Sequence, residues 1–405
     1  MSVKKFGALL VILIATLVLV FSVGMADNGF TPVEELGEFL YFDEDLSEPS
    51  GQSCASCHDP DFGFVDPDKG LPVSEGVILG LFGGRNSPAA AYAMYAPIRY
   101  FDEGEGLWIG GQFWDSRATG EVLGDPLADQ ALGPFLNAVE MANTSKAQVI
   151  ADVALSEYAD LFEQVWGWDA FNDVEAAYDQ VALSIAAFER TALFGQFSSK
   201  YDCYLQECLM LGGGKDDCAT GHGTIASIAS AIFSKKEWQG LQLFMGDAMC
   251  VACHVVDWTA AEDNFFIPAW SPDGSVPPLF TDFTYDNLGV PKSDHKLLKD
   301  AYVDLGLGAV VGESGENGKF KVMTLRNIAQ TGPYAHNGYF KKLEDITHFY
   351  NTRDVPGVLK KGADWPPPEY PATINVDELG NLGLSDSDED ALVKFMKTLS
   401  DGWMP

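Results

Sequence analysis

Apolar residues recur at helical spacing along most of the chain. The segments DVEAAYDQVALSIAAFERTALF (173–194) and SKKEWQGLQLFMGDAMC (234–250) place apolar side chains three and four positions apart, which predicts two amphipathic helices. Alternating apolar and polar runs are scarce, so we expect few strands. Stretches rich in glycine and proline at 267–280 and 364–383 predict long loops. The pattern indicates a mainly α protein.

A continuous apolar run lies near the N-terminus. The segment FGALLVILIATLVLVFSVG follows two lysines, and the small residues Gly24 and Ala26 stand just before Asp27. This order predicts a signal peptide over residues 1–26, with an uncleaved membrane anchor as the alternative. We therefore expect an exported, periplasmic protein that is soluble after cleavage.

The mature chain is long enough for two domains, and 47% of the 405 residues are hydrophobic, so large cores can form. The glycine-containing segment LMLGGGKDDCATGHGTIASIAS is the natural boundary. It predicts an N-terminal domain at 27–222 and a C-terminal domain at 223–405.

The chain carries 25 basic and 59 acidic residues, a formal net charge of −34. Such a charge repels nucleic acid and anionic lipid, and it attracts basic protein partners. Solubility alone is the plainer explanation of the same charge.

Three of the seven cysteines lie close together, and seven cysteines fit an exported protein. Cys203 and Cys208 are five positions apart on an expected helix, so their side chains diverge. The glycines at 212–214 let the chain fold back, which favours a disulfide between Cys208 and Cys218 and leaves Cys203 unpaired.

The other four cysteines form two C-x-x-C-H motifs, which are the main chemical signal. Cys54, Cys57 and His58 form the first, and Cys250, Cys253 and His254 form the second. In an exported protein this spacing predicts covalent c-type haem, with two thioethers and the histidine as proximal iron ligand. Zinc would need further ligands, and a thioredoxin-like pair predicts neither the histidine nor a second copy.

The chain resembles the bacterial di-haem cytochrome c peroxidases and their MauG-like relatives. The resemblance covers essentially the whole mature chain. It rests on GGRNSPAAAYA (83–93), QFWDSRA (112–118), DQALGPFLNAVEM (129–141), FKVMTLRNIAQTGPYAHNGYFKKLEDITHFYN (320–351) and DEDALVKFMKTLSDG (388–402). It implies two cytochrome c-like haem domains packed across a calcium-containing interface.

The resemblance implies that the first haem is open to peroxide. Many family members place a gating histidine after the first haem motif, but no histidine lies between His58 and His222 here. The first iron is therefore expected to be five-coordinate, as in the MauG-like branch, with Met94 as the competing ligand.

Glu140 and Gln130 match the family's distal glutamate and glutamine. A carboxylate above the iron can take a proton from peroxide and return it to the leaving oxygen. The sequence departs from the family at Ala138, where proline is usual, and in a longer spacer between Trp114 and Gln130. These departures leave the loop geometry open.

Trp114 matches the tryptophan that lies between the two haems and relays electrons, although a plain core aromatic is the alternative. Arg117 is expected to pair with a haem propionate or a neighbouring carboxylate.

The second haem differs from that of ordinary peroxidases, which have a methionine fourteen residues after the histidine of the P-Y-x-H-x-G motif. Counted from His336, that position is Tyr350, the MauG-like arrangement. A phenolate favours higher-valent iron. Met323 is the competing ligand, and His348 is expected to point away on its helix. The remaining histidines are expected in packing or solvated positions, at His336, His222 and His295.

The resemblance also implies one calcium ion. In the family it binds an asparagine side chain and the backbone carbonyls of a threonine and a proline, here Asn86, Thr331 and Pro333. Oxygen-only ligation suits this hard cation. The alternative is that Asn86 only caps a turn.

These features favour a periplasmic peroxidase that reduces hydrogen peroxide at the first haem and relays electrons through the second. The donor would be a small cytochrome c or copper protein. The alternatives are a MauG-like oxidase that modifies a protein substrate, a plain electron-transfer cytochrome and a peroxide-sensing module.

Overall fold

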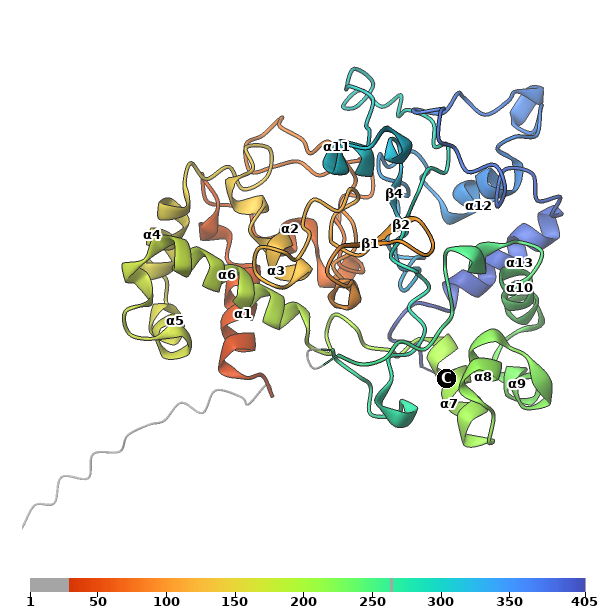
Figure 1. Cartoon of the computed structure of the whole chain (residues 1–405), viewed down its shortest axis with the longest axis horizontal. Coiled ribbons are helices and arrows are strands. Elements are labelled where there is room, and N and C mark those ends of the chain that lie inside the picture. Colours follow the sequence, from red (N-terminus) through yellow and green to blue (C-terminus); the bar gives the residue numbers. More distant parts are fainter. Residues whose placement is uncertain (1–28, 263–264, 405) are drawn as a thin grey trace, which may run out of the picture.

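The computed structural model describes residues 29–262 and 265–404, which form two helical halves lying side by side (Figure 1). The predicted signal peptide at 1–26 lies outside the described residues. The first half contains α1 (Pro32–Phe42), α2 (Cys54–Cys57), α3 (Pro126–Ala131), α4 (Lys146–Leu155), α5 (Ala159–Trp166) and α6 (Val174–Glu189).

The second half is also helical. It contains α7 (Lys200–Met210), α8 (Lys215–Thr220), α9 (Gly223–Ala229), α10 (Lys235–Met245), α11 (Leu307–Val311), α12 (Leu343–Thr352) and α13 (Asp386–Lys397). Strands are few and short, as predicted. β1 (Tyr100–Asp102) pairs with β2 (Leu107–Ile109), and β3 (Tyr285–Asp286) pairs with β4 (Phe320–Lys321), both antiparallel.

Both predicted amphipathic helices exist, but each ends five residues early. α6 stops at Glu189 because the chain turns back through Thr191, and the carbonyl of Phe194 then accepts a hydrogen bond from the Tyr92 backbone at 2.7 Å. α10 stops at Met245, and Met249 adopts a left-handed φ of 53° just before the second C-x-x-C-H turn. In both cases the loop that follows ends the helix before the apolar periodicity does.

A glycine permits the closest helix crossing in each half. A Cβ on Gly37 of α1 would lie 2.0 Å from the Ser184 carbonyl oxygen of α6. A Cβ on Gly240 of α10 would lie 2.0 Å from the Ala391 carbonyl oxygen of α13. The two halves therefore repeat one packing solution, in which an N-terminal helix touches a C-terminal helix through backbone.

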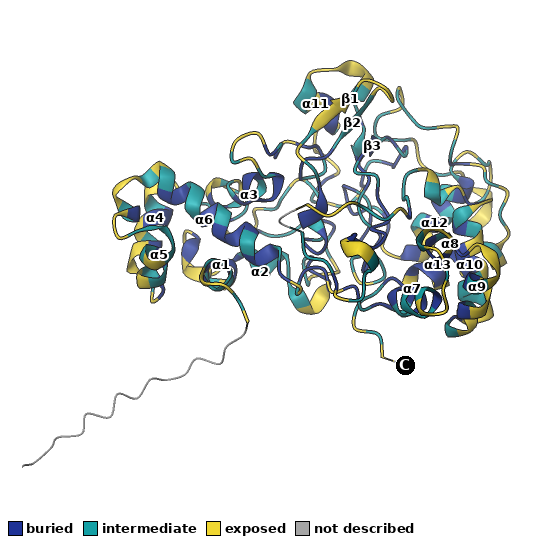
Figure 2. Ribbon diagram, turned by 60° about the horizontal axis from the view of Figure 1, so that its bottom comes forward, coloured by how far each residue is buried: buried dark blue, intermediate teal, exposed yellow. Residues whose placement is uncertain are grey.

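Two separate hydrophobic cores fill the halves, and helix faces that turn inward are buried (Figure 2). The first core runs from Leu36 to Phe197 and also takes in Val276 and Leu279. The second core begins at Tyr201, ahead of the domain boundary expected near residue 222. Helices α7 to α9 pack in the second core, while the domain division itself stays a prediction.

Polar contacts join the halves. Arg85 makes a two-pronged ion pair with Asp304, at 2.7 and 2.8 Å. Tyr92 donates a hydrogen bond to the Asp401 carboxylate at 2.8 Å, and Asn327 donates to the same carboxylate at 3.0 Å. The C-terminal segment thus lies across both halves.

The predicted disulfide between Cys208 and Cys218 is present, and Cys203 is a free thiol. It closes the loop between α7 and α8. Within the described residues, no helix has the length and apolar character needed to cross a bilayer.

We expect Gly240→Ala to destabilise the second half. The added methyl group would meet the α13 backbone, which moves only if the helices separate, so the free energy of unfolding should fall by roughly 1–3 kcal/mol, as in other overpacked cores. Denaturant unfolding of the haem-loaded protein, followed by circular dichroism, measures this loss.

Gly315→Ala is the matched control, because a Cβ there meets nothing within 4 Å. A Gly240→Ala protein that unfolds at the same denaturant concentration as this control would show that the α10–α13 contact tolerates a side chain.

Candidate active site

Each C-x-x-C-H motif lines a cavity of its own. The first cavity contains Cys54, Cys57 and His58, and the second contains Cys250, Cys253 and His254. The cavities share one wall, formed by Asn86, Ser87, Pro88, Ala89, Trp114, Lys321, Val322, Met323 and Thr324. We call these nine residues the shared wall.

The same backbone turn presents both histidines. The His58 amide donates to the Cys54 carbonyl and the His254 amide donates to the Cys250 carbonyl, each at 2.9 Å. The Nδ1 atom of His58 lies 3.2 Å from the Phe64 carbonyl oxygen, and that of His254 lies 2.9 Å from the Phe280 carbonyl oxygen. A carbonyl partner keeps the proton on Nδ1 and leaves Nε2 free to bind a metal.

The four cysteines of the motifs are free thiols. Burial raises the pKa of Cys57 and of Cys250 to about 12, so these thiols are neutral in the folded chain. Two thiols and one histidine in the lining of a largely apolar cavity are the donor set that a covalently attached haem requires. The residues present fit the predicted haems in both cavities.

The first cavity brings Glu140 and Gln130 together, as the sequence predicted. Asn137 donates a hydrogen bond to Glu140 Oε1 at 2.8 Å, and the Glu140 amide donates to the Asn137 carbonyl at 3.0 Å. This tight turn holds the carboxylate although Ala138 replaces the usual proline. Burial raises the pKa of Glu140, while the positive charge of Arg117 partly opposes that rise.

His58 is the one histidine among the described residues that line the first cavity. Met94 is not among these lining residues and is instead buried in the first core. Met141 and the shared-wall residue Met323 do line the cavity, and Met141 is also part of the core.

Trp114 lies in the shared wall and lines both cavities. Its indole Nε1 donates to the Asn86 backbone carbonyl at 2.8 Å, which fixes the ring relative to the first half. Arg117 pairs with the carboxylate of Asp115 at 3.0 Å and stacks over Phe113 at 3.6 Å, so its expected carboxylate partner is present.

The second cavity contains Tyr350, which α12 carries, and His336. Tyr350 lines the second cavity alone, whereas Met323 stands in the shared wall and lines both cavities. Burial raises the pKa of the Tyr350 phenol, so ionisation of this group requires a cation beside it.

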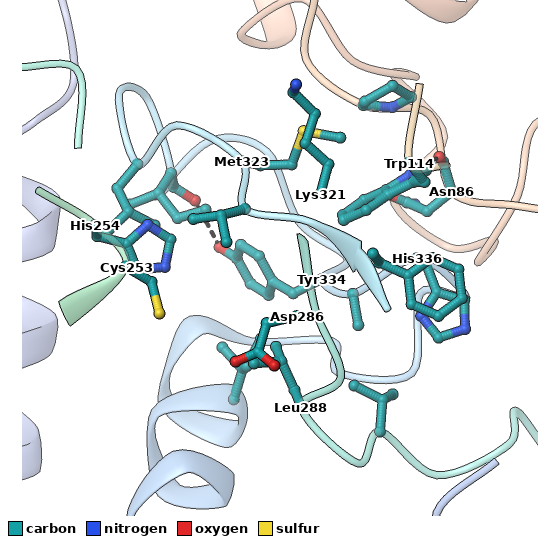
Figure 3. A pocket seen from close by; sticks show the side chains of 18 of the residues that line it. Asn86, Trp114, Cys253, His254, Asp286, Leu288, Lys321, Met323, Tyr334 and His336 are labelled. Atoms are coloured by element: carbon teal, nitrogen blue, oxygen red, sulfur yellow. Dashed lines mark hydrogen bonds between the residues drawn. The ribbon is translucent and has the colours of Figure 1, made fainter. Parts of the chain in front are cut away.

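The other two histidines near this cavity have protein partners. His348 contacts the Glu389 carboxylate at 3.0 Å and does not line the cavity, as the sequence predicted. His336 Nε2 lies 3.3 Å from the Glu369 carboxylate, and its ring stacks on Phe320 at 3.6 Å. Figure 3 shows His254 and Cys253 across the second cavity from Trp114, Asn86 and His336.

A third, smaller cavity of about 230 Å³ is lined by Asn86, Thr331 and Pro333 together. Asp66 and Asp68 also line it. The side-chain amide nitrogen of Asn86 donates to the Pro72 carbonyl at 3.1 Å, which leaves the side-chain amide oxygen available to a cation. The oxygen-rich lining suits calcium.

Two cavity residues were not predicted. Glu189, 5% exposed, lines the first cavity with an unpartnered Oε2 atom, and burial raises its pKa to about 8. Lys321, 6% exposed, stands in the shared wall, and burial lowers its pKa to about 7. The signal available in sequence was a charged residue beside apolar ones, Glu189 next to Arg190 in AAFERTAL and Lys321 in FKVMTL.

Comparison with known proteins agrees with this site. The family model described as di-haem cytochrome c peroxidase matches residues 32–208. Over 382 residues the chain is 35% identical to methylamine utilization protein MauG of Paracoccus denitrificans, spanning 90% of this chain and 88% of that protein. Over 311 residues it is 30% identical to cytochrome c551 peroxidase of Pseudomonas aeruginosa, spanning 77% and 69%.

A solved structure has the same fold. The diheme peroxidase BthA from Burkholderia thailandensis matches with a TM-score of 0.72 at 28% identity, covering 92% of this chain and 87% of that one. With two C-x-x-C-H cavities on one chain, these similarities show that the protein belongs to the di-haem cytochrome c peroxidase and MauG family, whose members are peroxide-dependent oxidoreductases.

Proposed function

We propose that this protein is a periplasmic peroxidase that consumes hydrogen peroxide in the first cavity and passes electrons there through the second. Two c-type haems would supply the iron that exchanges electrons with peroxide and with the donor. The observation that carries the proposal is the Glu140 carboxylate in a cavity whose described lining contains a single histidine, His58. A site without a second histidine ligand leaves room for peroxide.

Glu140 is the acid–base group of this proposal. Reduction of one hydrogen peroxide to two waters takes up two electrons and two protons, and one proton must move from the inner to the leaving oxygen. The raised pKa of Glu140 suits a carboxyl that first accepts and then donates this proton. Gln130 donates a hydrogen bond to the bound oxidant from the same cavity.

Trp114 connects the two sites. Its indole lies in the shared wall and is fixed through Nε1, so it offers an aromatic bridge for electrons between the cavities. Calcium held by Asn86, Thr331 and Pro333 would stabilise the position of Trp114. The side chain of Asn86 would bind the ion, and the backbone carbonyl of the same residue accepts the hydrogen bond of the indole.

Tyr350 is the proposed iron ligand opposite His254. The position of Tyr350 in the lining of the second cavity alone supports Tyr350 over Met323, which stands in the wall that both cavities share. The high phenol pKa requires a cation, and ferric iron supplies one.

The electron donor distinguishes two candidate functions. Export and a net charge of −34 fit a small, basic cytochrome c or copper protein as donor. A MauG-like oxidase that takes electrons from a protein side chain is the second candidate, and Tyr350 favours it, because an anionic ligand helps the second site retain an oxidising equivalent until a slow protein substrate arrives.

We expect Glu140→Gln to lower peroxide turnover by roughly 10²-fold or more, because glutamine keeps the shape but accepts no proton. Wild-type turnover should also fall on acidification through the raised pKa of Glu140, since the ionised form is the base. The variant should lack that pH dependence. Steady-state peroxide consumption by the oxidised protein, without prior reduction, measures both effects.

Glu75→Gln is the matched control. Glu75 also lines the first cavity, but its side chain accepts a hydrogen bond from the Gly80 amide at 2.6 Å, a loop contact. Wild-type turnover in the Glu140→Gln protein would remove Glu140 from the mechanism.

We expect Tyr350→Phe to change the low-spin haem spectrum, raise the reduction potential of the second haem and shorten the lifetime of the peroxide-oxidised protein. The change removes the oxygen that ligates iron and preserves the ring. Electron paramagnetic resonance and potentiometric titration measure these effects. Tyr334→Phe is the control, because Tyr334 lines the same cavity but donates its hydroxyl to the Ile328 carbonyl at 2.8 Å.

A Tyr350→Phe spectrum identical to that of wild type would place the ligand elsewhere. It would also favour the peroxidase over the protein-modifying oxidase.

A further inference from the structure

Lys321 carries a buried amine in the wall between the two cavities, and the proposed function gives it no role. It ends β4 and lines both cavities, and its side chain is 6% exposed. Within the described part of the chain it forms no ion pair. The Phe283 and Tyr285 rings each lie 5.4 Å from its Nζ atom.

A buried ammonium without a carboxylate partner is costly, and an apolar side chain of equal length would pack there at lower cost. The hydrogen bonds of Lys321 therefore indicate what its amine does in this position. Its Nζ atom donates to the Gly111 carbonyl at 2.7 Å and to the Gly110 carbonyl at 3.3 Å, and its backbone amide donates to the Trp114 carbonyl at 2.9 Å. All three acceptors belong to the loop that carries Trp114.

That loop has an unfavourable backbone. Gly110 and Gly111 have φ of 87° and 72°, and Phe113 and Ser116, on either side of Trp114, both have φ of 66°. Positive φ is uncommon for residues with a Cβ and costs free energy at each position. Such a loop keeps its shape only where contacts from outside it hold it.

The glycine conformation is what turns the two carbonyls toward Lys321. Each glycine is also packed tightly, since a Cβ on Gly110 would lie 2.4 Å from the Pro97 carbonyl oxygen and one on Gly111 would lie 2.5 Å from Ser116 Oγ. The Tyr285 hydroxyl adds a second donor to the Gly110 carbonyl, at 2.5 Å. Lys321 and Tyr285 come from the second half, while the loop belongs to the first.

We propose that Lys321 is a positioning residue for electron transfer, which clamps the Gly110–Ser116 loop from the opposite half so that the Trp114 indole stays between the two haem cavities. Figure 3 shows Lys321 and Trp114 at the same end of the second cavity, opposite His254. This inference rests on the proposed role of Trp114 as an electron bridge between the cavities. The test below can contradict the role of Lys321 without contradicting that of Trp114.

The test compares Lys321→Met, which removes the donors and keeps the length, with Lys319→Met. Lys319 lies two residues earlier, pairs with Glu316 at 3.1 Å and lines neither cavity. Stopped-flow spectroscopy of the haem-loaded protein gives two rate constants, one for the reaction of peroxide at the first haem and one for electron transfer between the haems.

We expect Lys321→Met to slow electron transfer between the haems by about tenfold or more, because a misplacement of about 1 Å in a reacting group can cost as much as 10²-fold. The reaction of peroxide at the first haem should stay at the wild-type rate, and Lys319→Met should change neither rate constant. Lys321→Arg, which restores donors and charge, should recover part of the lost rate.

The Trp114→Phe variant shows whether a negative result contradicts the role of Lys321 or the role of Trp114. If Trp114→Phe slows the inter-haem step and Lys321→Met does not, the clamp is wrong and the bridge stands. If Trp114→Phe has no effect, the bridge itself is wrong.

Should Lys321→Met fail to bind haem, Tyr285→Phe removes the other donor to the Gly110 carbonyl and leaves the fold intact. A smaller slowing of the same step then supports the clamp, and an unchanged rate contradicts it.

Discussion

The wall that the two cavities share is the constraint on which the rest of the structure depends. Nine residues from two distant segments, 86–89 and 321–324 together with Trp114, face both cavities. The wall also touches the first motif, because the Ser87 hydroxyl lies 3.4 Å from the His58 Nδ1 atom. One layer of chain thus separates the two cavities. Pairs of substitutions within this wall are expected to be non-additive, since neighbouring wall residues share contacts.

The local chemistry could be predicted from the sequence, whereas the contacts between the halves could not. C-x-x-C-H fixes cysteine and histidine positions within one turn, and the pairing of Cys208 with Cys218 follows from a short loop with three glycines. Glu140 and Gln130 meet in one cavity, as their motif implied. The ion pair between Arg85 and Asp304 joins residues 219 positions apart, and no local pattern specifies it. Glu189 and Lys321 were missed for a related reason, since a charged residue beside apolar ones shows no role until the fold reveals what it faces.

The proposed calcium site and the proposed electron bridge meet at Asn86. The Asn86 side chain lines the small cavity with Thr331 and Pro333, and its backbone carbonyl accepts the indole hydrogen bond of Trp114. The backbone amide of Asn86 also donates to the His336 backbone carbonyl at 2.7 Å, which ties Asn86 to the second half. A cation bound by the side chain would therefore restrain the backbone that orients the indole. In these two proposals, ion binding and electron transfer would be linked through Asn86.

The burial of the four motif thiols bears on the stage at which haem would be attached to the chain. Thioether formation needs a reactive sulfur, and reactivity follows the thiolate fraction. In the closed fold that fraction is very small, because burial holds the pKa of Cys57 and of Cys250 near 12. Both sulfurs also face the interior of the cavities that the haems fill. A lower thiol pKa on the open chain, before α1 packs on α6 and α10 packs on α13, would favour attachment at that stage.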